Sequence, residues 1–246
     1  MTNQPILVAV VMVAIAACSG CSSSPGRPKS DSEIIPPGQV MEFSLLYSQN
    51  CAGCHGANGK GGAAIALANP VFLTIADDSV IRRTTANGVR GTSMPAFAQS
   101  AGAMLSDKQI DALVSGIRSW AKSDILNNVT PPPYSSRTPG DPQRGAEAYR
   151  TYCSSCHGVD GRGGSKASSI VDTAYLALVS DQELRTIVIA GRPELGAPDW
   201  RGDIEGRPMS AEEISDVVAW VSSHRSKFPG QPYPISSTDV GKEGLR

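Results

Sequence analysis

Two copies of one pentapeptide constrain this chain more than any other feature: Cys51-Ala52-Gly53-Cys54-His55 and Cys153-Ser154-Ser155-Cys156-His157. C-x-x-C-H is the attachment signature of c-type haem. The two thiols bond to the porphyrin vinyl groups, and the adjoining imidazole binds the iron from one face. The sequence therefore predicts two covalently attached haem c groups, held by Cys51, Cys54, Cys153 and Cys156, with His55 and His157 as iron ligands.

Other interpretations of C-x-x-C fit this sequence poorly. A thioredoxin-like redox pair needs a βαβ context, and no such strand pattern surrounds either motif. A zinc ribbon joins two C-x-x-C knuckles across a short spacer, whereas about a hundred residues separate these two. Four of the six cysteines lie in the haem motifs, and the other two are Cys18 and Cys21. No cysteine is left for a structural disulfide in the body of the chain.

The first residues are typical of an export signal. The apolar run from Ile6 to Ala17 is shorter than the about 20 residues that a membrane span needs. It ends at Ile15-Ala16-Ala17-Cys18, which resembles a bacterial lipobox and predicts lipidation of Cys18, with Cys21 as a poorer second choice. Residues 1–5 carry no Lys or Arg, although signal peptides usually have a basic start. An ordinary cleaved signal and an uncleaved anchor are the alternatives, and all three place the haem domains outside the cytoplasm.

The rest of the chain is a tandem repeat. Tyr47-x-x-x-Cys51 matches Tyr149-x-x-x-Cys153, and the nine residues from Cys54 match the nine from Cys156 without a gap. A proline-rich segment with Pro131-Pro132-Pro133 separates the copies and predicts a stiff polar linker. The predicted organisation is a signal and lipobox at 1–18, a tether at 19–36, domain 1 at 37–123, the linker at 124–141, domain 2 at 142–228 and a tail at 229–246.

Within each copy the pattern is helical. Asp141-Pro142 predicts a capped helix leading into the second haem motif. Ser106-x-x-Gln109 and Ser210-x-x-Glu213 are capping boxes that predict the start of a closing helix in each copy. The apolar residues behind the boxes recur at helical spacing: Ile110, Leu113, Val114 and Ile117, then Ile214, Val217, Val218 and Val221. The predicted fold class is all-α. Each domain is small, and aromatic residues are 5% of the chain, so folding is expected to need the porphyrin.

These motifs together resemble the class I cytochromes c, over nearly the whole chain outside its ends. The resemblance implies two class I cytochrome c domains in tandem, joined by the proline-rich linker. It also implies a sixth iron ligand: Gly91-Thr92-Ser93-Met94-Pro95 resembles the loop through which the family presents a methionine. His55/Met94 ligation would raise the reduction potential, because a thioether favours Fe(II). Met104, just before the helix cap, is expected to pack.

The second copy departs from this pattern. An offset of 103 aligns Phe72 with Tyr175, Gly88 with Gly191 and Pro95 with Pro198. The same offset aligns Met94 with Ala197, and alanine cannot coordinate iron. Met209 precedes the closing helix as Leu105 does, so packing is favoured there, with ligation through a folded-back loop as the alternative. His224 aligns with Trp120, which favours packing or exposure. The second haem is therefore expected to be five-coordinate, water-bound or ligated by another residue.

Charge adds little. Residues 37–123 carry seven basic and five acidic residues, and residues 142–228 carry ten and twelve. Neither domain has the single strong sign that steers a highly charged partner, and nothing favours nucleic-acid binding. Four arginines are candidate partners of the haem propionates, with surface solvation as the alternative: Arg82, Arg83, Arg185 and Arg192.

These observations favour an extracytoplasmic, membrane-attached dihaem cytochrome c that transfers single electrons between respiratory redox partners. By resemblance, the partners expected are a cytochrome bc-type complex and a terminal oxidase. A haem enzyme or sensor is the alternative, with an open position on the second haem for peroxide reduction or gas binding. A third possibility is a haem subunit docked to a dehydrogenase. The lack of an evident distal histidine or nearby acid/base group in the sequence favours electron transfer over the enzyme.

Overall fold

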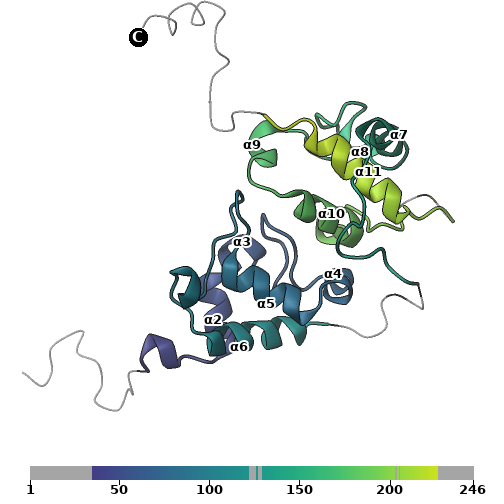
Figure 1. The fold of residues 1–246 in the computed structure, drawn as a ribbon. Coiled ribbons are helices and arrows are strands. Elements are labelled where there is room, and N and C mark those ends of the chain that lie inside the picture. The colour runs from purple at the N-terminus through teal and green to yellow at the C-terminus, as the bar shows by residue number, and fades with distance from the viewer. Residues whose placement is uncertain (1–34, 122–125, 127–128, 203, 205, 227–246) are drawn as a thin grey trace, which may run out of the picture. The chain divides into compact units, whose positions relative to one another are not determined.

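The computed structural model describes residues 35–121, 126, 129–202, 204 and 206–226 (Figure 1). The chain divides into two compact units, Met1–Gln39 and Val40–Arg246. The described part of the first unit holds a short 3-10 helix, η2 (Pro37–Gln39). The second unit contains both haem motifs, and its described residues form helices and loops without a named strand. The predicted all-α class is confirmed. The predicted signal, Cys18, Cys21, most of the tether and the tail lie outside the described residues.

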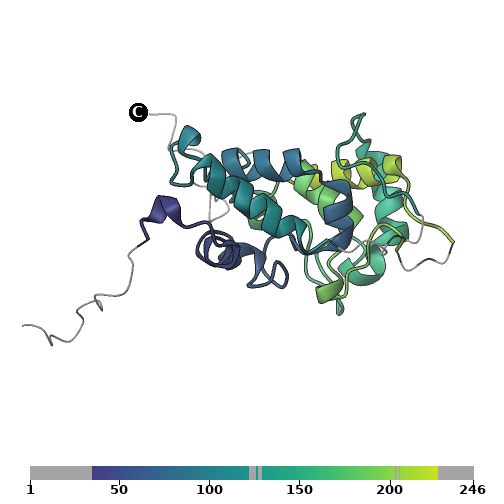
Figure 2. The ribbon, with the colours of Figure 1, turned by 90° about the horizontal axis from the view of Figure 1, so that it is seen from below.

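The first half of the larger unit contains the first of the two repeats. It contains α2 (Phe43–Asn50), α3 (Ala52–His55), α4 (Pro70–Ile75), α5 (Asp78–Asn87), η3 (Gln99–Ala101) and α6 (Asp107–Arg118). Sequence signals explain the helix starts: the Asn69 side chain caps α4, whose first residue is a proline, and Asp77 caps α5. Helix α6 packs against both α2 and α5 (Figure 2).

The second half repeats this order. It contains α7 (Pro142–Tyr152), α8 (Ser154–His157), α9 (Thr173–Leu176), α10 (Asp181–Ala190), η4 (Pro193–Leu195) and α11 (Ala211–Ser222). Asp141 caps α7, and complete capping boxes start α6 at Ser106 and α11 at Ser210. The helix starts predicted from these signals are confirmed.

The closing helices bury the predicted apolar faces. All eight residues of the two helical stripes are buried: Ile110, Leu113, Val114, Ile117, Ile214, Val217, Val218 and Val221. Each closing helix packs against the helix that precedes the haem motif, α6 against α2 and α11 against α7. Burial of a large aliphatic side chain contributes about 1.5–3 kcal/mol, so these helix pairs hold each repeat around its motif.

One arginine in each half, at or just after the end of the closing helix, binds the segment between two earlier helices: α4 and α5 in the first half, α9 and α10 in the second. Arg118 Nε donates to Asp78 Oδ1 at 2.7 Å, Nη2 donates to the Ala76 carbonyl oxygen at 2.7 Å, and Nη1 donates to the Leu73 carbonyl oxygen. Arg225 makes the same set of contacts in the second half, with the three residues 103 positions further along: Leu176, Val179 and Asp181. Since α4 ends at Ile75, Arg118 satisfies carbonyl groups that the helix leaves unpaired.

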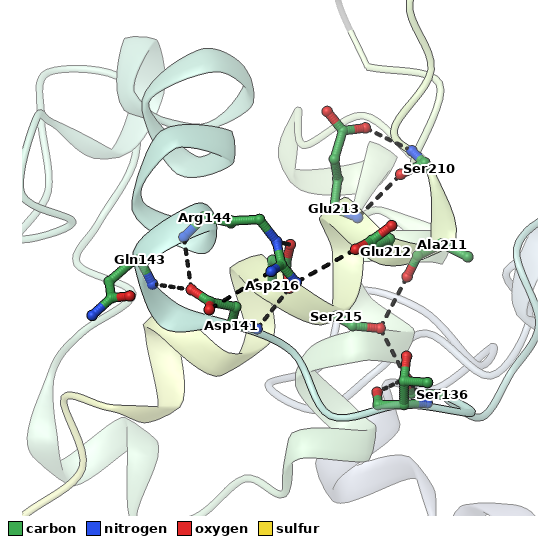
Figure 3. Close-up of polar contacts among 11 residues, drawn as sticks. Ser136, Asp141, Gln143, Arg144, Ser210, Ala211, Glu212, Glu213, Ser215 and Asp216 are labelled. Carbon is green, nitrogen blue, oxygen red and sulfur yellow. Dashed lines mark hydrogen bonds and ion pairs between the residues drawn. The ribbon is translucent and has the colours of Figure 1, made fainter.

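The end of the proline-rich linker is bonded to α10 and α11. Arg185 is buried, and its guanidinium donates to the carbonyl oxygens of Pro133 and Tyr134 at 3.0–3.2 Å. Ser136 Oγ lies 2.9 Å from Ser215 Oγ, and the Asp141 N–H donates to Asp216 Oδ1 at 2.6 Å (Figure 3). Residues 133–141 are therefore attached to the second repeat by side chains of its own helices.

Candidate functional site

The first motif lies where α2 ends and one turn of helix, α3, begins. Cys51 is buried, Cys54 is exposed, and neither is in a disulfide. His55 is buried, and its Nδ1 lies 2.8 Å from the Ile65 carbonyl oxygen. A carbonyl oxygen only accepts, so Nδ1 carries the proton and Nε2 is left with a lone pair for a metal. Burial lowers the pKa of His55, which favours the neutral imidazole that iron binds.

The second motif has the same arrangement. Helix α7 ends at Tyr152, and Cys153 precedes the single turn α8. Cys153 and Cys156 are half-buried free thiols. His157 Nδ1 lies 2.8 Å from the Ser168 carbonyl oxygen, which fixes the same tautomer as in the first motif. Each copy thus brings two free thiols and one oriented imidazole together within five residues, as covalent haem attachment requires.

A tyrosine in each repeat closes the glycine-rich loop after the motif. Tyr47 Oη donates to the Gly56 carbonyl oxygen at 2.9 Å, and Tyr149 Oη donates to that of Gly158. Gly56 and Gly158 have φ of 81° and 79°, which a side chain would strain. The sequence shows that the two tyrosines match, but it does not show this role. Their spacing from the motif is the signal that could have indicated it.

The loops that carry Met94 and Ala197 have the same backbone. The Val89 N–H donates to the Met94 carbonyl oxygen at 3.0 Å, and the Arg192 N–H donates to that of Ala197 at the same distance. A glycine with φ near 65° precedes each pair, Gly88 in one copy and Gly191 in the other. These contacts support the alignment of Met94 with Ala197.

Met209 lies in a packing position. It is buried in the hydrophobic core, and its N–H donates to the Trp200 carbonyl oxygen at 2.8 Å. Leu105 makes the matching bond to the Phe97 carbonyl oxygen in the first half, also at 2.8 Å. Met209 and Leu105 therefore make the same backbone bond just before the closing helix of their repeats. This geometry favours packing over ligation for Met209, as expected.

The remaining methionine and histidine candidates lie away from buried positions. Met104 is 81% exposed, so the expected packing role is wrong. This residue sits at the surface because the neighbouring Leu105 takes the core position. His224 is half-buried and contacts the Trp220 ring edge-on at 4.7 Å, as expected for a packing residue.

Three of the four arginines proposed for the haem propionates have other partners. Arg82 pairs with Asp107 and Asp111 at 3.0 and 2.7 Å. Arg185 donates to linker carbonyl groups, and Arg192 Nε donates to Glu194 Oε1 at 2.6 Å. The structure therefore gives no support to a propionate role for these three residues. For Arg83, which is exposed, the role stays a prediction.

Two helical repeats, each with a thiol pair and an oriented imidazole, define the class of protein: a c-type cytochrome with tandem class I domains. The donor set fits haem c, because four unpaired thiols are present and each motif histidine leaves Nε2 free. In the part of the chain that the structure describes, no other group of three or more histidine, cysteine or acidic side chains could hold a metal ion.

Comparison with known proteins agrees with this assignment to the c-type cytochromes. The family model for cytochrome c oxidase, cbb3-type, subunit III matches residues 38–115 and 140–221. The chain belongs to this family, and it therefore carries covalently bound haem c.

Curated relatives are distant. The chain is 24% identical to the cbb3-type cytochrome c oxidase subunit FixP of Sinorhizobium medicae, over 68% of this chain and 60% of that protein. It is 24% identical to a cytochrome bc1 complex cytochrome c subunit of Mycobacterium bovis, over 81% of this chain and 69% of that protein. Among solved structures, a Kuenenia stuttgartiensis reducing HAO-like protein complex, Kustc0457/Kustc0458, matches with a TM-score of 0.43 and 20% identity, over 78% of this chain and all of that one.

Proposed function

We propose that this chain is an extracytoplasmic dihaem cytochrome c that transfers single electrons between redox proteins of a respiratory chain. The observation that carries the proposal is the duplicated site, in which two free thiols precede an imidazole whose Nδ1 donates to a backbone carbonyl group. Bound haem supplies reversible one-electron chemistry. The chain supplies covalent attachment, imidazole orientation and the protein environment that sets the potential.

The first site is proposed to have His55/Met94 ligation. The support for this ligation is the Met94-Pro95 sequence, which resembles the loop through which the family presents a methionine, and a soft thioether stabilises Fe(II). Ala197 takes the corresponding backbone position in the second site. The two haems are therefore proposed to be unequal, with the higher potential at the first.

The proposed partners follow from the relatives. Two of them are named as subunits of a cbb3-type oxidase and of a cytochrome bc1 complex, so we propose that this chain exchanges electrons with such a quinol-oxidising complex, a terminal oxidase or a dehydrogenase. Attachment to the membrane through a lipid on Cys18 is part of the proposal. Among the described residues, no helix has both the length and the apolar character needed to cross a bilayer.

Redox titration of the purified, haem-loaded full chain tests the proposal. Two reversible one-electron steps are expected, with rapid reduction by bc1-containing membranes and rapid oxidation by a terminal oxidase. Absence of reversible reduction, or exchange with neither partner, would overturn electron transfer as the function.

Ala197 favours a second candidate function, the binding of an exogenous ligand at the second haem. An alanine frees the coordination position that methionine fills in the first copy. Carbon monoxide should bind one of the two reduced haems readily and the other poorly. Equal, weak binding at both haems would exclude this candidate and leave electron transfer intact.

A further inference from the structure

The two repeats contact each other through side chains that they do not share. Both repeats lie within the larger compact unit, Val40–Arg246, and α4 of the first packs against α10 of the second. At this contact Asn69 Nδ2 donates to the Ala190 carbonyl oxygen at 2.9 Å, and both residues are buried. Ala190 is the last residue of α10, where a helix leaves its carbonyl groups unpaired. Asn69 therefore supplies a partner to α10 from the other repeat.

A second bond crosses in the opposite direction. Arg192 is 8% exposed, and its Nη2 donates to the Gly62 carbonyl oxygen at 2.7 Å. Its Nη1 donates to the Ala63 carbonyl oxygen at 3.5 Å, and its Nε donates to Glu194 Oε1 in its own repeat. A guanidinium can bind a carboxylate and a carbonyl group at once, because its five N–H groups form a fixed fork. Arg192 therefore ties a loop of the first repeat to the second.

The sequence places each of these donors in one repeat only. At the constant offset of 103, Asn69 aligns with Asp172, and Val89 aligns with Arg192. Asp172 caps α9 by accepting from the Tyr175 N–H at 2.9 Å, but an ionised carboxylate donates no hydrogen bond. Valine has no polar side-chain group. Neither counterpart could make the bond in question, so the two donors serve the contact between the repeats and not the fold that the repeats share.

The Arg192 bond ends on the loop that orients the first iron ligand. Three residues after Gly62, the Ile65 carbonyl oxygen lies 2.8 Å from His55 Nδ1. The corresponding carbonyl group of the second repeat belongs to Ser168, which is exposed. The loop that orients His55 is therefore held from outside its own repeat.

The methionine loop of the first repeat also contacts the second repeat. The Ser93 N–H donates to the Leu178 carbonyl oxygen at 3.3 Å. Ser93 directly precedes Met94, the residue proposed as the sixth ligand of the first haem. The second repeat thus bonds to both loops of the first site, the one that orients the imidazole and the one that carries the methionine.

We propose that the second repeat positions the axial ligands of the first haem, with Asn69 and Arg192 as the positioning residues. Asn69 fixes α4 against α10, and Arg192 holds the loop that begins at Gly62. The imidazole of His55 and the thioether of Met94 then keep one orientation relative to the iron. A preorganised site of this kind needs little rearrangement when its charge changes. This inference rests on the His55/Met94 ligation in the proposed function.

The first test removes the bond to α10 and keeps the helix cap. Aspartate caps a helix as well as asparagine does, so Asn69→Asp loses only the amide that donates to Ala190. In the haem-loaded full chain, amide hydrogen exchange in the segment that holds Ser93 should accelerate roughly tenfold, the effect of one lost hydrogen bond. Asp172→Asn is the matched control in the second repeat. It also keeps its cap and should leave exchange unchanged.

The second test removes the guanidinium. Arg192→Val introduces the residue that the first repeat carries at this place. The electron paramagnetic resonance signal of the ferric first haem should broaden, because its imidazole is no longer held in one orientation. Exchange in the segment 62–65 should accelerate roughly tenfold. Arg201→Val is the matched control, since Arg201 pairs with Asp199 in its own repeat, and it should change neither readout.

The outcomes separate the inference from its premise. If the first haem of wild type lacks the low-spin spectrum of His/Met ligation, the premise is wrong and the inference falls with it. If that spectrum is present and neither Asn69→Asp nor Arg192→Val changes exchange or the resonance signal while haem content is normal, the ligation stands and the inference is wrong. Lower thermal stability with an unchanged resonance signal would show that the contact stabilises the fold without positioning the ligands.

Discussion

The ring of Phe43 occupies the place where a side chain at Gly116 would lie, so α2 and α6 meet through a large residue facing a small one. The second repeat reverses the pair. Gly145 on α7 corresponds to Phe43, Trp220 on α11 corresponds to Gly116, and a Cβ at Gly145 would approach Trp220 Cβ to 2.8 Å. One large and one small residue fill the crossing in either order, because the volume between two close helices is fixed.

Gly116→Ala and Gly145→Ala should each destabilise the haem-loaded protein by about 1–3 kcal/mol, because the added methyl groups meet a ring and a backbone at the helix crossings. Chemical denaturation measures the change. Phe43→Ala should rescue part of the Gly116→Ala loss. Gly38→Ala is the control, since no atom lies within 4 Å of a Cβ there. Equal effects at residues 38 and 116 would contradict the packing argument.

Asp216→Ala should destabilise the second repeat by about 1–3 kcal/mol, because this buried carboxylate accepts hydrogen bonds from the Asp141 N–H and from Arg144 (Figure 3). The matched control in the first repeat is Asp111→Ala, which removes an exposed partner of Arg82 and should change little. Thermal unfolding compares the two variants, and a larger loss for Asp111→Ala would show that burial does not decide the effect.

Acid should weaken the starts of α5 and α7. The pKa of Asp77 is lowered by hydrogen bonds from Ser79 Oγ and the Val80 N–H, and that of Asp141 by the N–H groups of Arg144 and Gln143. A lowered folded pKa means that the contribution is complete above about pH 4, the unfolded value, and is lost as pH falls through the folded value. Asp77→Asn keeps an acceptor and should flatten the acid side of the stability curve. An unchanged curve, measured by denaturation between pH 2 and 7, would contradict this assignment.

Mass spectrometry of the denatured chain should find two covalent haem additions. Substitution of Cys51 or Cys54 by alanine should lose or weaken attachment in the first repeat alone, and substitution of Cys153 or Cys156 should do so in the second. The haem-free chain should lack fixed tertiary packing, because each small core relies on the porphyrin for apolar surface. A single addition, or haem extracted by acidified organic solvent, would refute the assignment.

Ala197→Met should convert the second haem to a low-spin state and suppress carbon monoxide binding, because the thioether fills the free coordination position. Met94→Ala should open the first haem in the same way. Absorption and electron paramagnetic resonance spectra distinguish these states. If wild type already shows two low-spin His/Met haems and Met209→Ala removes one, Met209 is the ligand despite its buried position.

The sequence by itself determined the family, the attachment chemistry and the helical plan. A C-x-x-C-H motif places its ligands within five consecutive residues, so their proximity needs no tertiary contact. Capping boxes and apolar stripes are also formed by residues close together in the sequence, and the structure confirms the helices that they predict.

The tertiary structure decided what depends on contacts between distant residues. The alignment predicts that Ala197 replaces Met94, and the matching backbone bonds of the two loops, Val89 to Met94 and Arg192 to Ala197, show that both residues have the same place in their repeats. The sequence predicts that Arg185 is either a propionate partner or a solvated surface residue. In the structure it is buried and donates to the carbonyl groups of Pro133 and Tyr134 in the linker. The partner of a long polar side chain depends on which carbonyl or carboxylate the fold brings within about 3 Å, and the sequence pattern does not encode that distance.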